Sequence, residues 1–554
     1  MSAQQYDYQE KEKAGSGSFK GADVVATLED GVGANATNAF DQRKGEELKH
    51  ALLPRHMAMI SIGGVIGTGL FLGTAGSLHN AGPLGLWLGY LVMGSVCYAM
   101  MMCLGEMISY LPVPGGHIKL SERFVGKPLS FAMGWNYWYN WVIVLPAELS
   151  AAAVLMSYWS DANPAIWISV FLVIVVAINL LGTRAYGEAE FWFASIKIIT
   201  IVGLIILSIC IDLGVGKQGR LGFRYWKNPG PFKQYHGIQG SLGQFLGFFS
   251  VLINAAFSFI GTEIVAIASA EAKNPRKSVP SAIRKVWIRI CLFYFLGTFM
   301  IGLVCSSNAP ELTMGHKTAA RSPFVVAINA AGIRALPSII NAALVTSAVS
   351  AASSDLFTSS RALYSLAIAG SAPRIFARTT KHGLPYIAVA VSIAFSFLSY
   401  MSVRDGASTV FGYFANMTSI AGMVTWFCIG IMYIRFHTAM KVQGMSRDVL
   451  PYRAWLQPFC GYWTVCTTFI VMLFSGWSIF LNGNWSTSDF ITNYIPIPFF
   501  IIMYVGNWVY NRNNGAHIPA QEVDLTTGLR EIIEAEVPEE KPTTIGGKVW
   551  AFIS

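Results

Sequence analysis

Six ionisable side chains lie inside long apolar runs of this sequence. They are Glu106, Glu148, Lys197, Glu263, Asp355 and Arg361. On membrane-insertion scales, a charged residue at the centre of a bilayer costs about 2.5–3.5 kcal/mol. If these runs cross a membrane, each of the six side chains is therefore a candidate for function.

Lys197, in the run SIKIITI, has the chemistry to carry a proton. A lysine in a low dielectric exchanges its proton more readily than a lysine in water. The alternative is that its long side chain reaches a membrane surface about six to nine residues away.

The four carboxylates and the arginine each have two interpretations. Glu148, in LPAELSAA, either binds an ammonium group of a ligand or forms a polar clamp between helices. Glu263 either belongs to a gate or caps a helix. Glu106 and Asp355 are expected to act in structure or gating. Asp355 is further expected to pair with Arg361, six residues later in the same run, or with basic loops.

Glycines weaken one apolar run at its centre. Residues Ser61–Gly76 read SIGGVIGTGLFLGTAG, with four glycines in the stretch GGVIGTG. Each glycine costs a helix about 1 kcal/mol relative to alanine, and the bilayer offers a loosened backbone no water. Taken alone, the run is equally consistent with close packing through Gly63 and Gly67 and with local unwinding.

A second weak point, FSFIGTEIV, follows five runs later and has Gly261 at its centre. Interrupted helices at matching positions of two halves indicate an inverted-repeat transporter with a ligand site near the midplane. The amide groups of one half-helix attract an anion, and the free carbonyls of the other break attract a cation, so a zwitterion fits both. The predicted binding residues are Ile62, Gly63, Gly64, Gly67, Thr68, Gly69, Glu148, Phe257, Ser258, Phe259, Ile260 and Gly261.

The elements that carry these residues are predicted to be membrane helices. Of the 554 residues, 53% are hydrophobic and only 12% are charged, whereas soluble domains contain about 25% charged residues. Apolar runs long enough to cross a hydrocarbon core of about 30 Å follow one another along most of the chain. We therefore predict an all-α polytopic membrane protein with twelve transmembrane helices, at about 57–78, 82–111, 128–160, 165–182, 188–213, 241–270, 282–307, 337–368, 384–402, 408–434, 459–481 and 489–511.

The twelve-helix domain is predicted to span residues 51–511, between a disordered N-tail (1–50) and a C-tail (512–554). The N-tail contains no apolar signal segment, so the first span is expected to serve as the signal. The loops on the N-tail side contain about twenty Lys and Arg and the opposite loops about nine, which predicts that both termini are cytoplasmic. The basic loop 214–240, which would lie outside, is an exception.

Other classes of protein receive little support from the sequence. The eight cysteines are isolated and lack metal-binding spacing, so we expect packing roles, no metal and no cofactor. The net charge of +9 fits basic loops at a membrane better than nucleic-acid binding. No nucleophile–base constellation indicates an enzyme, and no filter segment or charged ring indicates a channel.

Several stretches, in order from about residue 49 to 511, resemble the fungal amino-acid permeases of the yeast amino-acid transporter family, within the amino acid–polyamine–organocation superfamily. They include LKHALLPRHMAMISIGGVIGTGLFLGTAG, CLGEMISYLPVPGG, GWNYWYNWVIVLPAELSAA, EFWFASIKIIT, FSFIGTEIVAIASAEAKNPRKSVPSAIRKV and ASSDLFTSSRALYSLA. The resemblance implies a LeuT-like fold: a 5+5 inverted repeat with broken helices 1 and 6, plus two additional helices.

The resemblance also implies proton-driven amino-acid uptake across the plasma membrane. It assigns proton coupling to Lys197, a gating and pH-sensing region to Glu263, an aromatic lid to Phe257 and a contact with the substrate side chain to Ile260. The partners it implies are an amino acid, a proton and the lipid bilayer. They also include a ubiquitin ligase or adaptor acting on N-tail lysines 11, 13 and 20.

The substrate is left open among three groups. Glu148 would repel a second carboxylate, which favours neutral amino acids or a broad range. Segments such as RLGFRYWKNPG resemble dicarboxylic amino-acid permeases, and proline or GABA remains a third possibility. An amino-acid sensor is the alternative class, although sensors of this family have a longer N-tail.

Overall fold

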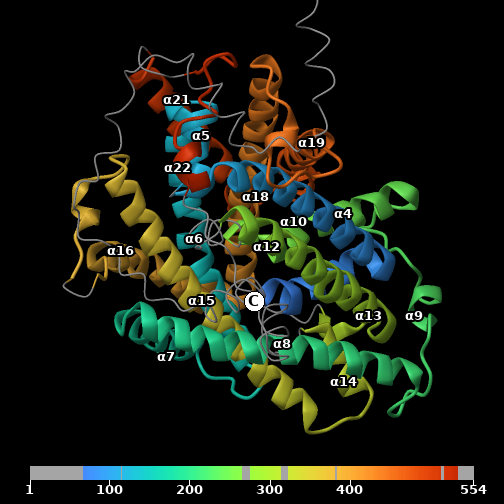
Figure 1. The fold of residues 1–554 in the computed structure, drawn as a ribbon. Helices are drawn as coiled ribbons and strands as arrows, with labels where there is room; N and C mark the ends of the chain where they lie inside the picture. The colour runs from blue at the N-terminus through green and yellow to red at the C-terminus, as the bar shows by residue number, and fades with distance from the viewer. Residues whose placement is uncertain are drawn as a thin grey trace, which may run out of the picture.

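A computed structural model describes residues 67–113, 115–264, 275–312, 322–380, 383–512 and 517–534, apart from the side chains of Thr183, Arg184 and Ala282. All the regular elements within these ranges are helices (Figure 1). The predicted site residues Ile62, Gly63 and Gly64, like the N-tail lysines, lie outside the described residues.

Nine helices in the described ranges are long and apolar enough to cross a membrane, or ten if the bent pair α20 (Thr487–Tyr494) and α21 (Pro496–Tyr510) forms one span. The first two predicted spans appear as one helical stretch, Gly69–Tyr110. The fourth corresponds to α7 (Pro164–Leu180), which has only 17 residues, slightly fewer than the about 20 that cross a bilayer without tilt. A polytopic helical membrane protein is therefore confirmed.

Two packed groups of long helices form the centre of the molecule. In one, α4 (Thr74–Tyr110) packs along α10 (Gly240–Phe259). In the other, α6 (Lys127–Met156) packs against both α15 (Leu336–Ile368) and α18 (Ala407–Val442). These helices are apolar around most of their circumference, as expected for helices surrounded by protein and lipid.

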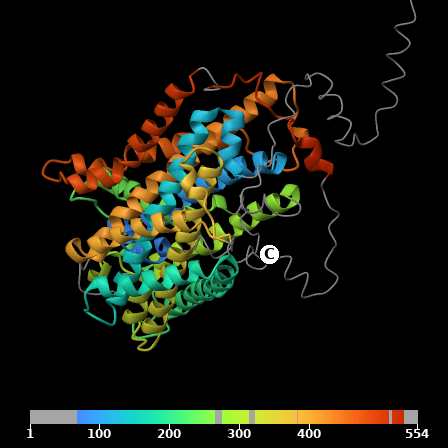
Figure 2. The ribbon, with the colours of Figure 1, turned by 90° about the vertical axis from the view of Figure 1, so that its left-hand side faces the viewer.

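The remaining helices surround this centre (Figure 2). Helix α8 (Thr183–Leu213) contacts α7 and α15, and α19 (Phe459–Leu473) contacts α4 and α18. The others, listed with their bounds, are η1 (Gly69–Gly73), α5 (Gly116–Phe124), α9 (Arg224–Lys227), α12 (Pro275–Arg289), η2 (Ile290–Phe295), α13 (Leu296–Val304), η3 (Pro310–Leu312), α14 (Pro323–Ala330), η4 (Arg374–Ala377), α16 (Tyr386–Ser396), η5 (Phe397–Met401), α17 (Ser402–Asp405), η6 (Arg447–Val449), η7 (Trp477–Phe480) and α22 (Leu529–Glu534).

A kink at Gly82 and Pro83 lets the loop 214–240 settle on α4. Gly82 has φ +77°, and a Cβ there would lie 2.8 Å from the carbonyl oxygen of Pro231. The Leu84 amide donates to that same oxygen at 3.0 Å, and Lys233 donates to the Ala81 carbonyl at 3.2 Å. The loop is thus folded, and it covers the end of the helix pair that carries the kink.

At the opposite end of α4, the C-terminal segment docks onto α5. The guanidinium of Arg123 donates to the carbonyl of Asp524 at 2.7 Å, to its carboxylate at 3.0 Å and to the carbonyl of Thr527 at 2.8 Å. Three apolar side chains of the segment, Val523, Leu525 and Leu529, are buried. Part of the predicted C-tail therefore packs as an ordered strap against the helical domain.

Candidate functional site

Helix α10 breaks at the predicted position. It ends at Phe259, and Ile260 is extended with φ −60° and ψ 144°. Gly261 follows with φ +88°, a conformation that favours glycine. A Cβ at Gly261 would also lie 3.0 Å from the ring of Trp141. The backbone here loses its regular helical pairing, as the glycine at mid-run predicts.

The segment Gly67–Gly73 passes directly beside this break. Residues Gly69–Gly73 form a π-helical turn rather than an α-helix. A Cβ at Gly69 would lie 2.7 Å from the Ser258 hydroxyl and 3.0 Å from Ser258 Cα. Only glycine fits such an approach without a shift of the backbone. The described part of the first span is thus helical from Thr68 onward, and the predicted unwinding at Gly63 and Gly64 lies outside the described residues.

A cavity of about 1680 Å³ opens between the two weakened segments. It exceeds the roughly 300–1,000 Å³ of a closed ligand pocket, so it is an open passage rather than a closed pocket. Eight of the predicted site and gating residues line it: Gly67, Gly69, Glu148, Phe257, Ser258, Ile260, Gly261 and Asp355.

Glu148 is an acidic group at the wall of this cavity. Its side chain is buried, and Thr68 donates a hydrogen bond of 2.9 Å to its Oε1. Among the described residues, Oε2 has no hydrogen-bond partner. A buried carboxylate oxygen without a partner is costly, and an ammonium group in the cavity would satisfy it.

Aromatic side chains also line this cavity. Tyr137 and Trp141, in the stretch GWNYWYNW, face it from α6. Phe257 lines it from α10 and meets Phe411 edge-on, with ring centroids 5.8 Å apart. The apolar run alone gives no signal of which aromatic residues face the cavity.

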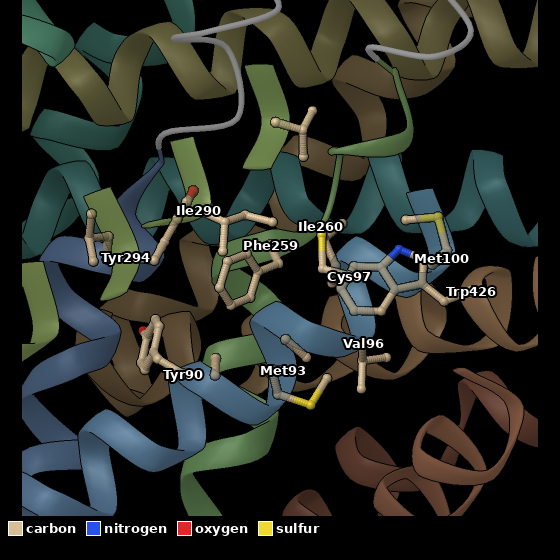
Figure 3. Close-up of a cluster of buried hydrophobic side chains, with 14 of the residues drawn as sticks. Tyr90, Met93, Val96, Cys97, Met100, Phe259, Ile260, Ile290, Tyr294 and Trp426 are labelled. Carbon is tan, nitrogen blue, oxygen red and sulfur yellow. The ribbon is translucent and has the colours of Figure 1, made fainter. Parts of the chain in front are cut away.

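Phe259, by contrast, does not line the cavity and lies in the hydrophobic core beside Tyr90 and Tyr294 (Figure 3). Its ring lies 4.5 Å from that of Tyr294 and 6.0 Å from that of Tyr90, measured between centroids. Ile260, next to it, packs on the Gly422 backbone, where a Cβ would lie 2.5 Å away. Phe259 therefore anchors the broken end of α10 and does not contact the passage.

Lys197 is fully buried behind the cavity wall and does not line the cavity. Its Nζ lies 3.7 Å from Oε1 of Glu190, and Ser350 donates a hydrogen bond of 2.8 Å to Oε2 of Glu190. Glu190 was not among the predicted site residues. Its only sequence signal is its spacing of seven residues from Lys197, which places both side chains on one face of α8.

Asp355 and Arg361 both line the cavity but form no ion pair with each other in the described part of the chain. Arg361 donates to the Phe357 carbonyl at 3.2 Å, and its guanidinium lies 3.2 Å from the centroid of the Phe357 ring. Residues six apart on a helix point to different sides, which explains why the expected pair does not form.

Glu263 is buried just beyond the break and lies outside the cavity lining. The indole of Trp426 donates to its Oε2 at 3.5 Å. Arg289, which is also buried, lies within electrostatic range of this carboxylate. Glu263 thus lies next to the break in α10, where a change in its charge would act directly on the break.

Glu106 lies in a separate cluster near α5. Tyr433 donates to it at 2.6 Å, the Ala454 amide at 2.7 Å, and Arg447 forms an ion pair with the same carboxylate. This carboxylate ties the segment 443–458 to α4. The geometry fits a structural tie and gives Glu106 no contact with the cavity.

The cavity opens toward α5. Its lining extends to Lys119 and Glu122 of α5, Lys127 at the start of α6, and Tyr510 and Asn511 at the end of α21. At the other end, the Lys233 ammonium donates to the Ser307 carbonyl at 3.2 Å, and His79 approaches the same oxygen at 3.3 Å. The cavity thus reaches the end of the molecule that carries α5, whereas the loop 214–240 is tied to the opposite end of α4.

A many-helix membrane protein with a large cavity, lined by polar groups where a helix breaks, has the architecture expected of a transporter. The chain belongs to the amino acid permease family, whose model matches residues 56–520.

Individual relatives are similar along nearly the whole chain. A proline-specific permease of Saccharomyces cerevisiae is 42% identical over 501 residues, covering 88% of this chain and 80% of the relative. A dicarboxylic amino acid permease of the same yeast is 41% identical over 500 residues, covering 89% and 82%. A lysine-specific permease, also from that yeast, is 39% identical over 513 residues, covering 92% and 83%.

Proposed function

We propose that this permease is a proton-coupled symporter that imports neutral amino acids, or a broad range of them, across the plasma membrane. The observation that carries the proposal is the cavity between the Gly67–Gly73 segment and the broken end of α10. A free amino acid presents a carboxylate and an ammonium group a few ångströms apart, and this cavity offers a partner for each.

The carboxylate is proposed to bind the backbone amides of the glycine-rich segment. Amide groups freed at a helix break carry partial positive charge and are used for anions wherever a helix starts. The ammonium is proposed to lie between the carbonyls at Ile260–Gly261 and the carboxylate of Glu148, whose Oε2 is unsatisfied among described groups. Trp141 and Phe257 are proposed to close over the substrate side chain.

The fold proposed for this mechanism is the LeuT-like 5+5 inverted repeat with broken first and sixth spans, within twelve spans in all. The order and spacing of the described helices support it, as does the break observed in α10. The end that carries α5 is proposed to be cytoplasmic, since Lys119, Arg123 and Lys127 cluster there. In that orientation the passage is open to the inside.

The transported proton is proposed to bind to Lys197 and the buried ionisable groups around it. A proton crossing the membrane gains about 2.3 kcal/mol per 100 mV, and a tenfold concentration ratio costs about 1.4 kcal/mol. One proton per substrate therefore sustains roughly a fortyfold gradient at 100 mV. This is sufficient for concentrative uptake.

The proposed substrate class follows from the charges that line the cavity more than from similarity to individual relatives. The named relatives differ in substrate, one being proline-specific, one lysine-specific and one dicarboxylic, at nearly equal identity. Glu148 and Asp355 both line the cavity, and two carboxylates oppose an acidic side chain. The aromatic wall favours apolar side chains, so neutral amino acids rank first.

Uptake of labelled amino acids into permease-deficient yeast cells tests the proposal. The account predicts accumulation above the external concentration, collapse by a protonophore, and competition by neutral amino acids before acidic ones. Uptake that only equilibrates would contradict coupling. Signalling without any uptake would instead indicate a sensor.

A further inference from the structure

Glu190 is a buried titratable group that the mechanism above leaves unused. It lies on α8, two helical turns before Lys197, and about 1% of its surface is exposed. One carboxylate oxygen faces the Lys197 ammonium at 3.7 Å, and the other accepts the 2.8 Å hydrogen bond from Ser350 of α15. Oε1 has no hydrogen-bond partner among the described residues.

Among the residues that the structure describes, the charges around this pair do not balance. Asp355 lies within electrostatic range of Glu148, Lys197 and Glu190, and Glu148 within range of Lys197. These four groups contain three carboxyls and one amine. Even when Arg361, farther along α15, is counted, the cations are fewer than the carboxyls. Because unpaired buried charge is costly, a proton held on one of these carboxyls would relieve the excess of negative charge.

A closed aromatic contact separates Glu190 from the cavity. Tyr186, one turn before Glu190 on the same face of α8, lines the cavity and donates its hydroxyl to Ser354 at 3.0 Å. Its ring stacks on Phe357 at 3.9 Å between centroids. Asp355 lines the cavity beside this contact. From the protein interior toward the cavity, the order is therefore Lys197, Glu190, the Tyr186–Ser354 contact, and the cavity itself.

We infer that Glu190 is the group that accepts the proton from Lys197 and releases it to the cavity, an inference that rests on the proposed proton symport. In the step, the Nζ–H bond of the lysine ammonium breaks and an O–H bond forms on Glu190, which turns an ion pair into a neutral pair. The present 3.7 Å exceeds a hydrogen bond, so the two side chains must approach for transfer. Opening of the Tyr186–Ser354 contact then lets the proton leave past Asp355.

Glu190→Gln tests the inference in proteoliposomes that contain the full chain and a trapped pH-sensitive dye. Labelled L-proline, L-leucine, L-lysine and L-aspartate are used as probes. Two modes are measured, accumulation driven by an imposed proton gradient and exchange of internal for external substrate. Glu188→Gln, a half-buried carboxyl two positions away on the same helix, is the matched control.

The inference predicts that Glu190→Gln retains exchange, loses accumulation and no longer acidifies the vesicle interior during uptake, while Glu188→Gln behaves as wild type. If Glu190→Gln accumulates substrate and moves protons like wild type, the inference is overturned. If it loses exchange as well, while remaining monodisperse in detergent, Glu190 is structural and the inference is overturned too. A wild-type protein that ignores the proton gradient refutes the proposed symport itself, which is a different result.

Two milder variants decide the matter if Glu190→Gln does not fold. Glu190→Asp keeps the carboxyl but moves it away from Lys197, and Ser350→Ala removes the hydrogen bond to Oε2. Both are expected to shift the pH profile of uptake while leaving the exchange rate at saturating substrate near that of wild type. Unchanged pH profiles in both variants would refute the assignment.

Discussion

Thr68 donates a hydrogen bond of 2.9 Å to Glu148, eighty residues away, and so ties the glycine-rich segment to helix α6 at the wall of the cavity. The bond fixes one oxygen of Glu148 and leaves the other without a hydrogen-bond partner among the described residues. It also joins the peptide backbone at 67–69 and the carboxylate at 148, the two groups proposed to bind the substrate.

Thr68→Val is therefore expected to weaken substrate binding. Hydrogen bonds to charged groups contribute about 1.5–3 kcal/mol, so KM should rise roughly tenfold or more. Thr68→Ser keeps the hydroxyl and serves as the control, with KM near that of wild type. Concentration-dependent uptake measures both, and equal KM values for the two variants would contradict the role of the bond.

Gly69→Ala is expected to destabilise the protein and reduce transport. The new Cβ would meet Ser258 at 2.7 Å, and overpacking of this kind costs about 1–3 kcal/mol. Gly73→Ala is the matched control, because a Cβ there meets nothing within 4 Å. Thermal unfolding in detergent should show a lower transition for Gly69→Ala alone.

Gly261→Ala tests the break in α10 through backbone strain as well as through steric overlap. A residue with a side chain at φ +88° is strained by roughly 1–2 kcal/mol, and the Cβ would press on Trp141. The prediction is a loss of substrate binding greater than that caused by Gly76→Ala, a position with open space. Identical transport by the two alanine variants would show that the break is not needed.

His117, on α5 outside the spans, predicts a pH dependence of stability. Burial lowers its pKa from 6.5 to about 4, because neither ring nitrogen has a described partner to support the charge. Between pH 6.5 and pH 4, the unfolded chain thus binds a proton at His117 that the folded chain does not. The contribution of His117 to the free energy of unfolding is therefore fully present above pH 6.5 and is lost as the pH falls toward 4. Each unit by which the pKa is lowered corresponds to about 1.4 kcal/mol of unfolding free energy. Between pH 7 and pH 5, the temperature of thermal unfolding should fall more steeply in wild type than in His117→Phe.

The contact between α5 and the C-terminal segment predicts local protection. Arg123→Gln removes the three hydrogen bonds to Asp524 and Thr527, and amide exchange of residues 517–534 should accelerate. Arg530→Gln, whose exposed ion pair with Glu534 contributes little, should leave that exchange unchanged. Equal exchange in both variants would mean that the apolar contacts alone hold the segment.

The sequence predicts the helical membrane architecture and the position of the break in α10, because hydropathy and glycine placement are local properties. It also singles out Glu148 and Lys197, since a charge in an apolar run is conspicuous, and the structure buries both side chains. Twelve separate spans are not all distinguishable in the structure, because the helix continues from Gly69 through the kink at Gly82.

The rest depends on which way each side chain points. Phe257 lines the cavity and Phe259 enters the core, although both occur in the same four-letter stretch FSFI. Trp141 faces the passage although its surroundings are typical of an interfacial belt. Glu190 escapes notice because it lies near the start of α8, close to charged residues that read as a membrane boundary. Only the meeting of α8 with α15 shows that it is buried.

Coupled flux in proteoliposomes tests the central claim most directly. Purified protein is reconstituted, a proton gradient is imposed, and accumulation of labelled L-proline and L-leucine is measured for wild type and for Lys197→Ala. The account predicts that wild type concentrates substrate and that a protonophore abolishes this, while Lys197→Ala exchanges substrate but does not concentrate it. A Lys197→Ala protein that still accumulates substrate against its gradient would contradict the account.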